Sequence, residues 1–340
     1  MIQTRTAFAQ GVADAWRGIG LKQSPLLGDI DPRDTSMWWR VPVGAMVGVV
    51  GAFVGLIVLM IVAGVTWMVI AGPEKVQEAV PIMQSYIGGA AKPGYGASLS
   101  ILAALCLING AAALIVVTLA SLVCRRSPFK SFTAVGRWRW RHLVVGLCLN
   151  LILLAPVMGF DVWRGGSPAQ FPMVSFSHSA VQVVLYFVVA LVTLTLAAGA
   201  EELIFRGWFL RHSAGLVRLT WIFLPLNAVL FSAAHGDFDP NAFIDRSLAG
   251  LALTYMALRF GGIEYSTGAH TANNLLIVLF IEPLSLVTPP PMPFDVLSLV
   301  EGLLGLALSI TGVELAVRWA PIRRLMGPPA ASLTGPAEAT

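Results

Sequence analysis

The sequence predicts an all-α fold, a polytopic bundle of transmembrane helices. Hydrophobic residues occupy 56% of its 340 positions and charged residues only 12%, whereas a soluble domain carries about 25% charged residues. The mean hydropathy is +0.77. This composition excludes a soluble domain, and the apolar residues fall into long runs that are typical of membrane-spanning helices.

About eight of these runs can cross the roughly 30 Å of hydrocarbon in a bilayer. The fourth run is longer than a bilayer needs, and the sixth is short. We place the spans at residues 43–71, 98–123, 143–160, 179–210, 217–235, 247–260, 265–287 and 296–317.

The basic residues orient this arrangement in the membrane. If both termini lie in the cytoplasm, the outer side holds few of the 22 lysines and arginines, namely Lys75, Lys92, Arg164 and Arg246. Arg206 is counted on the inner side. Such a bias follows the positive-inside rule and predicts cytoplasmic N- and C-termini.

The segments outside the spans differ in character. For residues 73–96 we predict a short surface helix and a turn. In residues 125–142, arginine alternates with tryptophan. That alternation favours lipid headgroups as partners over nucleic acid. We divide the chain into a cytoplasmic tail at 1–40 with an interfacial helix near 7–19, N-terminal transmembrane helices at 41–178, a core at 179–290, a last transmembrane helix at 291–326 and a disordered tail at 327–340.

Two adjacent carboxylates and an arginine lie where lipid would be expected. Glu201, Glu202 and Arg206 follow a run in which residues 179–200 carry no charge. An ionisable group at that depth costs a few kcal/mol or more and is a functional-site hypothesis. On a helix, Glu202 and Arg206 are four apart and can form an ion pair, while Glu201 points about 100° away from that pair. One glutamate is thus predicted to be neutralised and the other to be free to react.

Two later spans also carry polar residues. Phe231 and His235 share one helix face, and His270 and Asn274 share another. Taken alone, each pair could serve interhelical hydrogen bonding. Three spans that present acid, imidazole and amide groups in one part of the chain indicate a common site.

These residue types suit proton transfer and the stabilisation of an oxyanion. A partly desolvated carboxylate such as Glu201 can act as a general base on water, and a histidine can share that water or bind a metal. The amide of Asn274 and the imidazole of His270 can donate hydrogen bonds to a tetrahedral oxyanion. Ser232 lacks an acidic partner nearby in the sequence, so attack of an activated water on an amide bond is favoured over covalent catalysis.

The three motifs together resemble the signature of the CPBP intramembrane proteases, which include the type II CAAX prenyl endopeptidases and bacterial relatives linked to bacteriocin self-immunity. The resemblance covers about residues 180–282. It implies a helical bundle around a polar cavity that opens toward the membrane. Carried over by position, it implies Glu201 as the base, His235 as its partner on the water, Glu202 and Arg206 as an architectural pair, His270 and Asn274 as the oxyanion hole, and Phe231 beside the substrate.

The sequence leaves metal dependence open. Glu201, His235 and His270 could furnish three zinc ligands, but the chain has no His-Glu-x-x-His pair. A metal-free or weakly metal-bound site is slightly favoured, and zinc is the cofactor considered. Asp237 and Asp239 are expected to be solvated loop acids.

One geometric mismatch arises from straight spans. They place Glu201 near the inner surface and His235 near the outer end of its span, which separates the two by a depth on the order of 10 Å.

The sequence therefore predicts a bacterial inner-membrane endopeptidase that cleaves a membrane-associated peptide or protein segment. Two other classes stay open: a non-catalytic membrane factor that binds or sequesters a peptide, and a proton-coupled transporter. The absence of broken helices in paired halves argues against the transporter.

Overall fold

The structure is a computed structural model that describes residues 24–27, 37–87, 94–133, 136–164, 171–175, 179–216, 220–281 and 292–327. Within these ranges the regular structure is helical, apart from an isolated β-bridge between Thr133 and Gly262. The all-α prediction is therefore confirmed. The predicted helix near residues 7–19 and the tail beyond residue 327 lie outside the described residues.

Five helices are long and apolar enough to cross a membrane. This finding confirms a multi-pass membrane protein. Four are single elements and the fifth is a continuous helix with three parts. They are α2 (Met37–Ala71), α4 (Tyr95–Val123), α5 (Trp140–Arg164), α12 (Val296–Arg318), and the run of α7 (Ala180–Glu202), the π-helical η3 (Leu203–Leu210) and α8 (Arg211–Leu216).

The remaining predicted spans are helical too. They correspond to α9 (Thr220–Ala233), α10 (Pro240–Phe260), and α11 (Glu264–Leu276) with the π-helical η4 (Ile277–Ile281). These are short or polar, so the total of eight spans stays a prediction. The predicted surface helix after the first span is α3 (Pro73–Ile87). The short elements η1 (Pro25–Leu27), η2 (Pro128–Ser131), α6 (Pro172–Ser175) and α13 (Ala320–Met326) complete the described chain.

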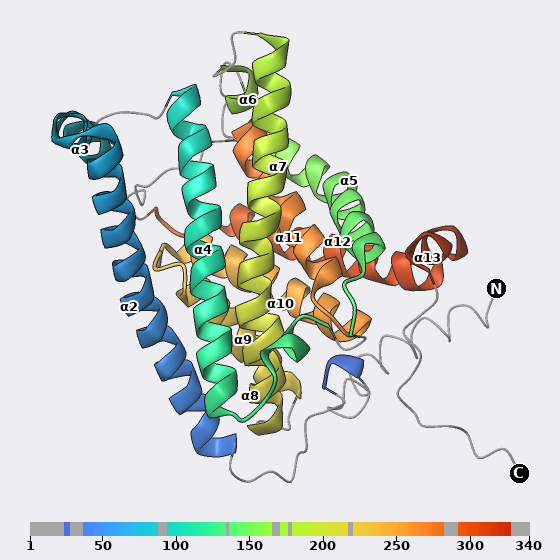
Figure 1. Ribbon diagram of the computed structural model, residues 1–340. Helices are drawn as coiled ribbons and strands as arrows, with labels where there is room; N and C mark the ends of the chain where they lie inside the picture. Colours follow the sequence, from blue (N-terminus) through green and yellow to red (C-terminus); the bar gives the residue numbers. More distant parts are fainter. Residues whose placement is uncertain are drawn as a thin grey trace, which may run out of the picture.

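The helices surround α11 rather than forming a simple ring. Figure 1 shows α2, α4 and α7 running side by side, with α10 and α11 behind α7 and with α5 and α12 to the right of α7. Helix α11 packs against α5, α7 and α10. Most of its residues are buried even though its sequence, EYSTGAHTANNLL, is largely polar. The neighbouring helices therefore shield α11 from lipid.

Two glycines permit the close approach of α5 to α11. A Cβ atom at Gly146 of α5 would collide with the backbone carbonyl of Tyr265, and one at Gly268 of α11 would collide with that of Leu143. Small residues at a crossing let two membrane helices approach backbone to backbone. His270 follows Gly268 by two residues, so this contact also fixes the position of the imidazole.

We expect Gly146→Ala to lower the free energy of unfolding by about 1–3 kcal/mol because the added methyl group overpacks the α5–α11 contact. Gly159→Ala on the same helix is the matched control, since a Cβ there meets nothing within 4 Å. The control is expected to be neutral or slightly stabilising, as alanine favours helix over glycine by up to about 1 kcal/mol. Unfolding of the two purified variants in detergent measures both effects, and equal stabilities would contradict this account of the crossing.

Candidate active site

The two glutamates sit where an α-helix widens into a π-helix. Glu201 and Glu202 end α7, and the π-helical segment η3 begins at the next residue. Such segments occur frequently at functional sites. The side chain of Glu202 is fully buried, whereas that of Glu201 is 23% exposed. The two adjacent carboxylates therefore have different surroundings, as the sequence predicted.

Glu202 forms the predicted ion pair with Arg206. The Nη1 atom of Arg206 lies 2.9 Å from Oε1 of Glu202, and both side chains have no exposed surface. The other terminal nitrogen, Nη2, donates to the carbonyl of Gly250 on α10 at 2.9 Å. The guanidinium also lies over the Phe231 ring, with Cζ 4.3 Å from the ring centroid, which favours a cation–π contact.

The placement of Arg206 corrects the sequence analysis, which counted this residue on the inner side of the membrane. Arg206 lies within the apolar span Ala180–Ala214 and is completely buried. Its charge is paired with Glu202. Arg206 is therefore no evidence for the orientation of the chain in the membrane.

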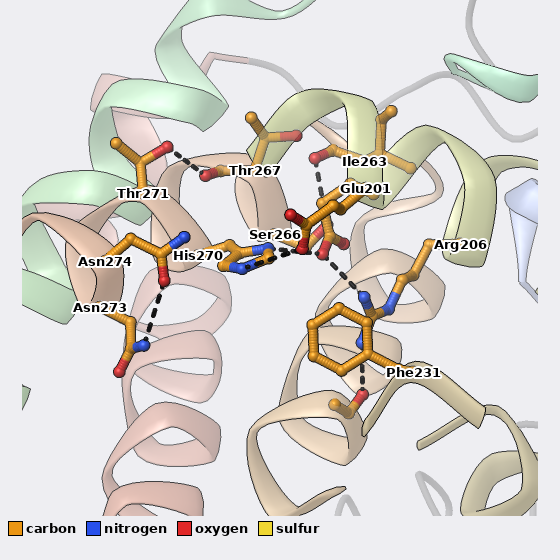
Figure 2. A network of polar contacts seen from close by, with 12 residues as sticks. Glu201, Arg206, Phe231, Ile263, Ser266, Thr267, His270, Thr271, Asn273 and Asn274 are labelled. Atoms are coloured by element: carbon orange, nitrogen blue, oxygen red, sulfur yellow. Dashed lines mark hydrogen bonds and ion pairs between the residues drawn. The ribbon is translucent and has the colours of Figure 1, made fainter. Parts of the chain in front are cut away.

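His270 lies between the two carboxylates, as Figure 2 shows. Its Nδ1 atom is 3.2 Å from Oε1 of Glu202, and its Nε2 atom is 3.7 Å from Oε2 of Glu201. An ionised carboxylate only accepts hydrogen bonds, so Nδ1 carries the proton in this contact. The Nε2 atom is thereby directed toward Glu201.

His235 approaches the same oxygen of Glu201 from the turn that follows α9. Its Nε2 atom is 3.9 Å from Oε2 of Glu201, and its Nδ1 atom is 2.9 Å from the carbonyl oxygen of Phe231. A carbonyl accepts but cannot donate, so Nδ1 carries a proton here. In the neutral imidazole, Nε2 is then a hydrogen-bond acceptor that faces Glu201.

The carboxylate of Glu201 has one oxygen engaged and one available. Oε1 accepts a hydrogen bond of 3.1 Å from the amide of Asn109 on α4. Oε2 is buried and has no hydrogen-bond partner within the described parts of the chain. Both imidazole Nε2 atoms therefore converge on an oxygen that is free to take a proton.

The expected depth mismatch between Glu201 and His235 is wrong. The helix that carries Glu201 continues through η3 and α8 to Leu216, 15 residues further on, and His235 follows the start of α9 at Thr220 by the same 15 residues. The two stretches are therefore equally long in residues, and Nε2 of His235 comes within 3.9 Å of Oε2 of Glu201. The error came from ending the span at residue 210, which placed Glu201 too near the inner surface.

Asn274 is held beside His270 by its neighbour. The amide nitrogen of Asn273 lies 3.4 Å from Oδ1 of Asn274, which leaves the amide nitrogen of Asn274 turned toward His270 in Figure 2. That nitrogen is a hydrogen-bond donor at the edge of the site.

A cavity of about 460 Å³ joins these groups. The predicted residues Glu201, Phe231, His235, His270 and Asn274 line it, whereas Glu202 and Arg206 lie behind its wall. Polar residues that the sequence analysis missed also face it. They are Asn150, Asp245, Arg246, Asn273 and Ser309.

Asn109 and Asn150 could have been found from the sequence. Each is an amide within an apolar run, 98–123 and 143–160 respectively, which is the signal that singled out His270. Asn150 of α5 links two helices, because its Oδ1 atom accepts a hydrogen bond from Ser309 of α12 at 3.3 Å. Asp245 gives no such signal, since it stands near other charges.

The two loop acids are not solvated as expected. Asp237 binds Arg246 at 2.5 Å, and this hydrogen bond holds the pKa of Asp237 below its ordinary value. Asp239 is nearly buried and caps α10, accepting from the backbone amides of Asn241 and Ala242. Its hydrogen bond from the Met292 amide is the main reason that the pKa of Asp239 is lowered. Both acids therefore stabilise the conformation of the loop between His235 and the start of α10.

The side chains around Glu201 do not fit a zinc ion as they stand. Within the described residues, no group of three or more His, Cys, Asp and Glu side chains could hold a metal ion. Donors bound to one tetrahedral zinc at about 2.0–2.1 Å lie about 3.4 Å apart, whereas the two imidazoles are 3.7 and 3.9 Å from Oε2 of Glu201. The donor types match zinc chemistry, but the spacing is wider than the ion requires.

The fold and the site define a multi-pass membrane protein with an acid–histidine centre in a cavity between its helices. Residues 183–276 match the model of a family described as type II CAAX prenyl endopeptidase Rce1-like. This match confirms the resemblance to the CPBP intramembrane proteases that the three motifs predicted. At the level of the family, it supports a CAAX-protease-like intramembrane endopeptidase.

A curated relative extends the similarity beyond this segment. The chain is 28% identical over 163 residues to the uncharacterized protein YyaK of Bacillus subtilis (strain 168). The match covers 46% of this chain and about half, 53%, of that protein. No solved structure matches the chain.

We expect Arg206→Met to lower the free energy of unfolding by about 3–5 kcal/mol, because Glu202 would stay buried without its charge partner. The double variant Glu202→Gln with Arg206→Met removes both charges, and its free energy of unfolding should fall markedly less than that of the single variant. Arg323→Met, at an exposed arginine of α13, is a control expected to stay within about 0.5 kcal/mol of the wild type. Unfolding in detergent measures all three, and equal losses in the single and double variants would refute a buried ion pair.

Proposed function

We propose that this protein is an intramembrane endopeptidase that hydrolyses a peptide bond of a membrane-associated peptide or protein. The observation that carries the proposal is the free oxygen of Glu201, which faces the Nε2 atoms of two histidines at a cavity lined by both polar and apolar side chains. Glu201 acts as the general base and His235 as its partner on the water.

The spacing of Glu201 and His235 suits a bridging water. A water molecule that donates one hydrogen bond to each acceptor at about 2.8 Å can span the 3.9 Å between Oε2 of Glu201 and Nε2 of His235. Both of its protons are then engaged, and its lone pairs point toward the cavity. The water attacks the carbonyl carbon while Glu201 takes a proton, which it later passes to the departing amine nitrogen.

His270 and Asn274 stabilise the oxyanion that forms on the attacked carbonyl. The amide nitrogen of Asn274 donates one hydrogen bond. Donation from Nε2 of His270 requires the imidazolium form, because Nδ1 already faces Glu202. Phe231 touches both histidine rings, with centroids 5.0 and 5.7 Å away, and forms the apolar wall against which the substrate lies.

We also propose the inner membrane of a bacterium as the location, with cytoplasmic termini and membrane lipids as partners. The distribution of lysine and arginine supports that orientation. The proposed substrate is a bacterial peptide or membrane-protein segment.

Glu201→Gln should reduce cleavage of a library of membrane-associated peptides by about 10²- to 10⁴-fold, the usual contribution of a general base. His235→Ala should reduce it as well, because the water loses its second acceptor. Purified protein in detergent or liposomes, with product analysis by mass spectrometry, provides the measurement.

Glu78→Gln is the control for this experiment. Glu78 lies on α3 with a side chain that is 68% exposed, so its substitution should leave the rate unchanged. A wild type that binds peptides tightly without cleaving them would instead support a non-catalytic binding factor. Wild-type activity retained in Glu201→Gln would remove Glu201 from the proposed role.

We expect a chelator to leave the cleavage rate within about twofold of its untreated value, because attack by a water held between Glu201 and His235 needs no metal. The rate is compared before and after treatment with EDTA and again after added zinc. Loss of activity that zinc restores would show that the site contracts around the ion, and the protein would then be a metalloprotease.

A further inference from the structure

Asn109 is a polar residue of the site that lies outside the segment shared with the family. It belongs to α4, whereas the family match begins at residue 183. Its amide nitrogen donates to Oε1 of Glu201 at 3.1 Å, and the two residues are 92 positions apart in the chain. Leu105, one turn earlier on the same helix face, lines the active-site cavity. The contact therefore reaches the site through the α4–α7 packing.

We infer that Asn109 is a positioning residue that orients the Glu201 carboxylate so that one of its oxygens faces the two imidazoles. This inference rests on the proposed function of Glu201 as the base. The terminal torsion of a glutamate is broad and roughly two-fold, so a carboxylate held at one end alone can rotate. The hydrogen bond from Asn109 occupies Oε1, and Oε2 is left to face both imidazoles.

Asn109 also completes the polar surroundings of Glu201. A carboxylate oxygen accepts hydrogen bonds, and Oε1 receives one from the Asn109 amide. An amide is suited to this role inside a membrane, since it offers a donor without adding a net charge. Arg206 cannot provide this support, because its guanidinium is bound to Glu202 and Gly250.

The composition of α4 agrees with a functional reason for this residue. Asn109 is the sole amide in the segment Tyr95–Val123, whose other polar side chains are hydroxyls of serine, threonine and one tyrosine and the thiol of Cys106. A strongly polar side chain in a membrane helix is costly unless it is satisfied by a partner. Its partner here is the carboxylate on which catalysis would depend.

The test compares Asn109→Leu, which keeps the size of the side chain and removes the donor, with wild type. We expect kcat to fall by about tenfold to a hundredfold, the range for a lost hydrogen bond to a charged group, with KM changed less than about threefold because substrate contacts remain. Ser100→Ala on the same helix is the control, because that hydroxyl bonds to its own helix at Gly96 and is exposed. Its kcat should equal that of wild type.

A double variant separates positioning from a general structural effect. If Asn109 acts through Glu201, adding Asn109→Leu to Glu201→Gln should leave the residual rate unchanged. A further loss in the double variant, or a wild-type kcat in Asn109→Leu, would overturn the inference and leave the proposed function standing.

An inactive wild type would refute the proposed function, and the positioning contact would then be decided by infrared spectroscopy. The Glu201 carboxylate band is identified as the difference between wild type and Glu201→Gln. A shift of this band in Asn109→Leu, absent in Ser100→Ala, supports the hydrogen bond. An unshifted band overturns it.

Discussion

A pair of opposite charges with no exposed surface holds four helices together. Glu202 and Arg206 lie inside an apolar span, and removing each ion from water costs several kcal/mol that the pair alone does not offset. Further contacts are needed, and they come from different helices: Gly250 of α10, Phe231 of α9 and His270 of α11. The requirement to satisfy one buried charge pair therefore sets the relative positions of the helices that carry both histidines.

The two adjacent glutamates differ in their surroundings rather than in their chemistry. Glu202 is bound by a guanidinium and an imidazole, so its charge is compensated. Within the described residues, the polar contacts of Glu201 are a neutral amide and the two Nε2 atoms of the histidines, and Glu201 faces the cavity. Two carboxyl groups in unlike environments are a common arrangement for acid–base chemistry. The π-helical segment that starts after them, at Leu203, lets the helix continue while both side chains keep these partners.

Contacts within one helix could be predicted from the sequence, and contacts between helices could not. The Glu202–Arg206 pair follows from its spacing, and the apolar runs are helices because hydropathy and length act locally. The partner of Asn109 depends on how α4 packs on α7. The same holds for Arg139, which binds Glu264 through two nitrogens, at 2.9 and 2.6 Å, at the start of α11. No local pattern encodes which distant helix will supply such a partner.

Helix α11 shows why hydropathy alone is a poor guide to this site. Its first two turns, from Glu264 to Thr271, are polar and almost wholly buried, and the predicted span at 265–287 depended on the apolar residues that follow. A helix of this kind is stable in a membrane only if other helices enclose it, since its polar groups would find no partners in lipid. The glycine contacts of α5 and the ion pair of Arg139 provide that enclosure. The N-terminal helices therefore contribute to the site by keeping α11, and with it His270, away from lipid.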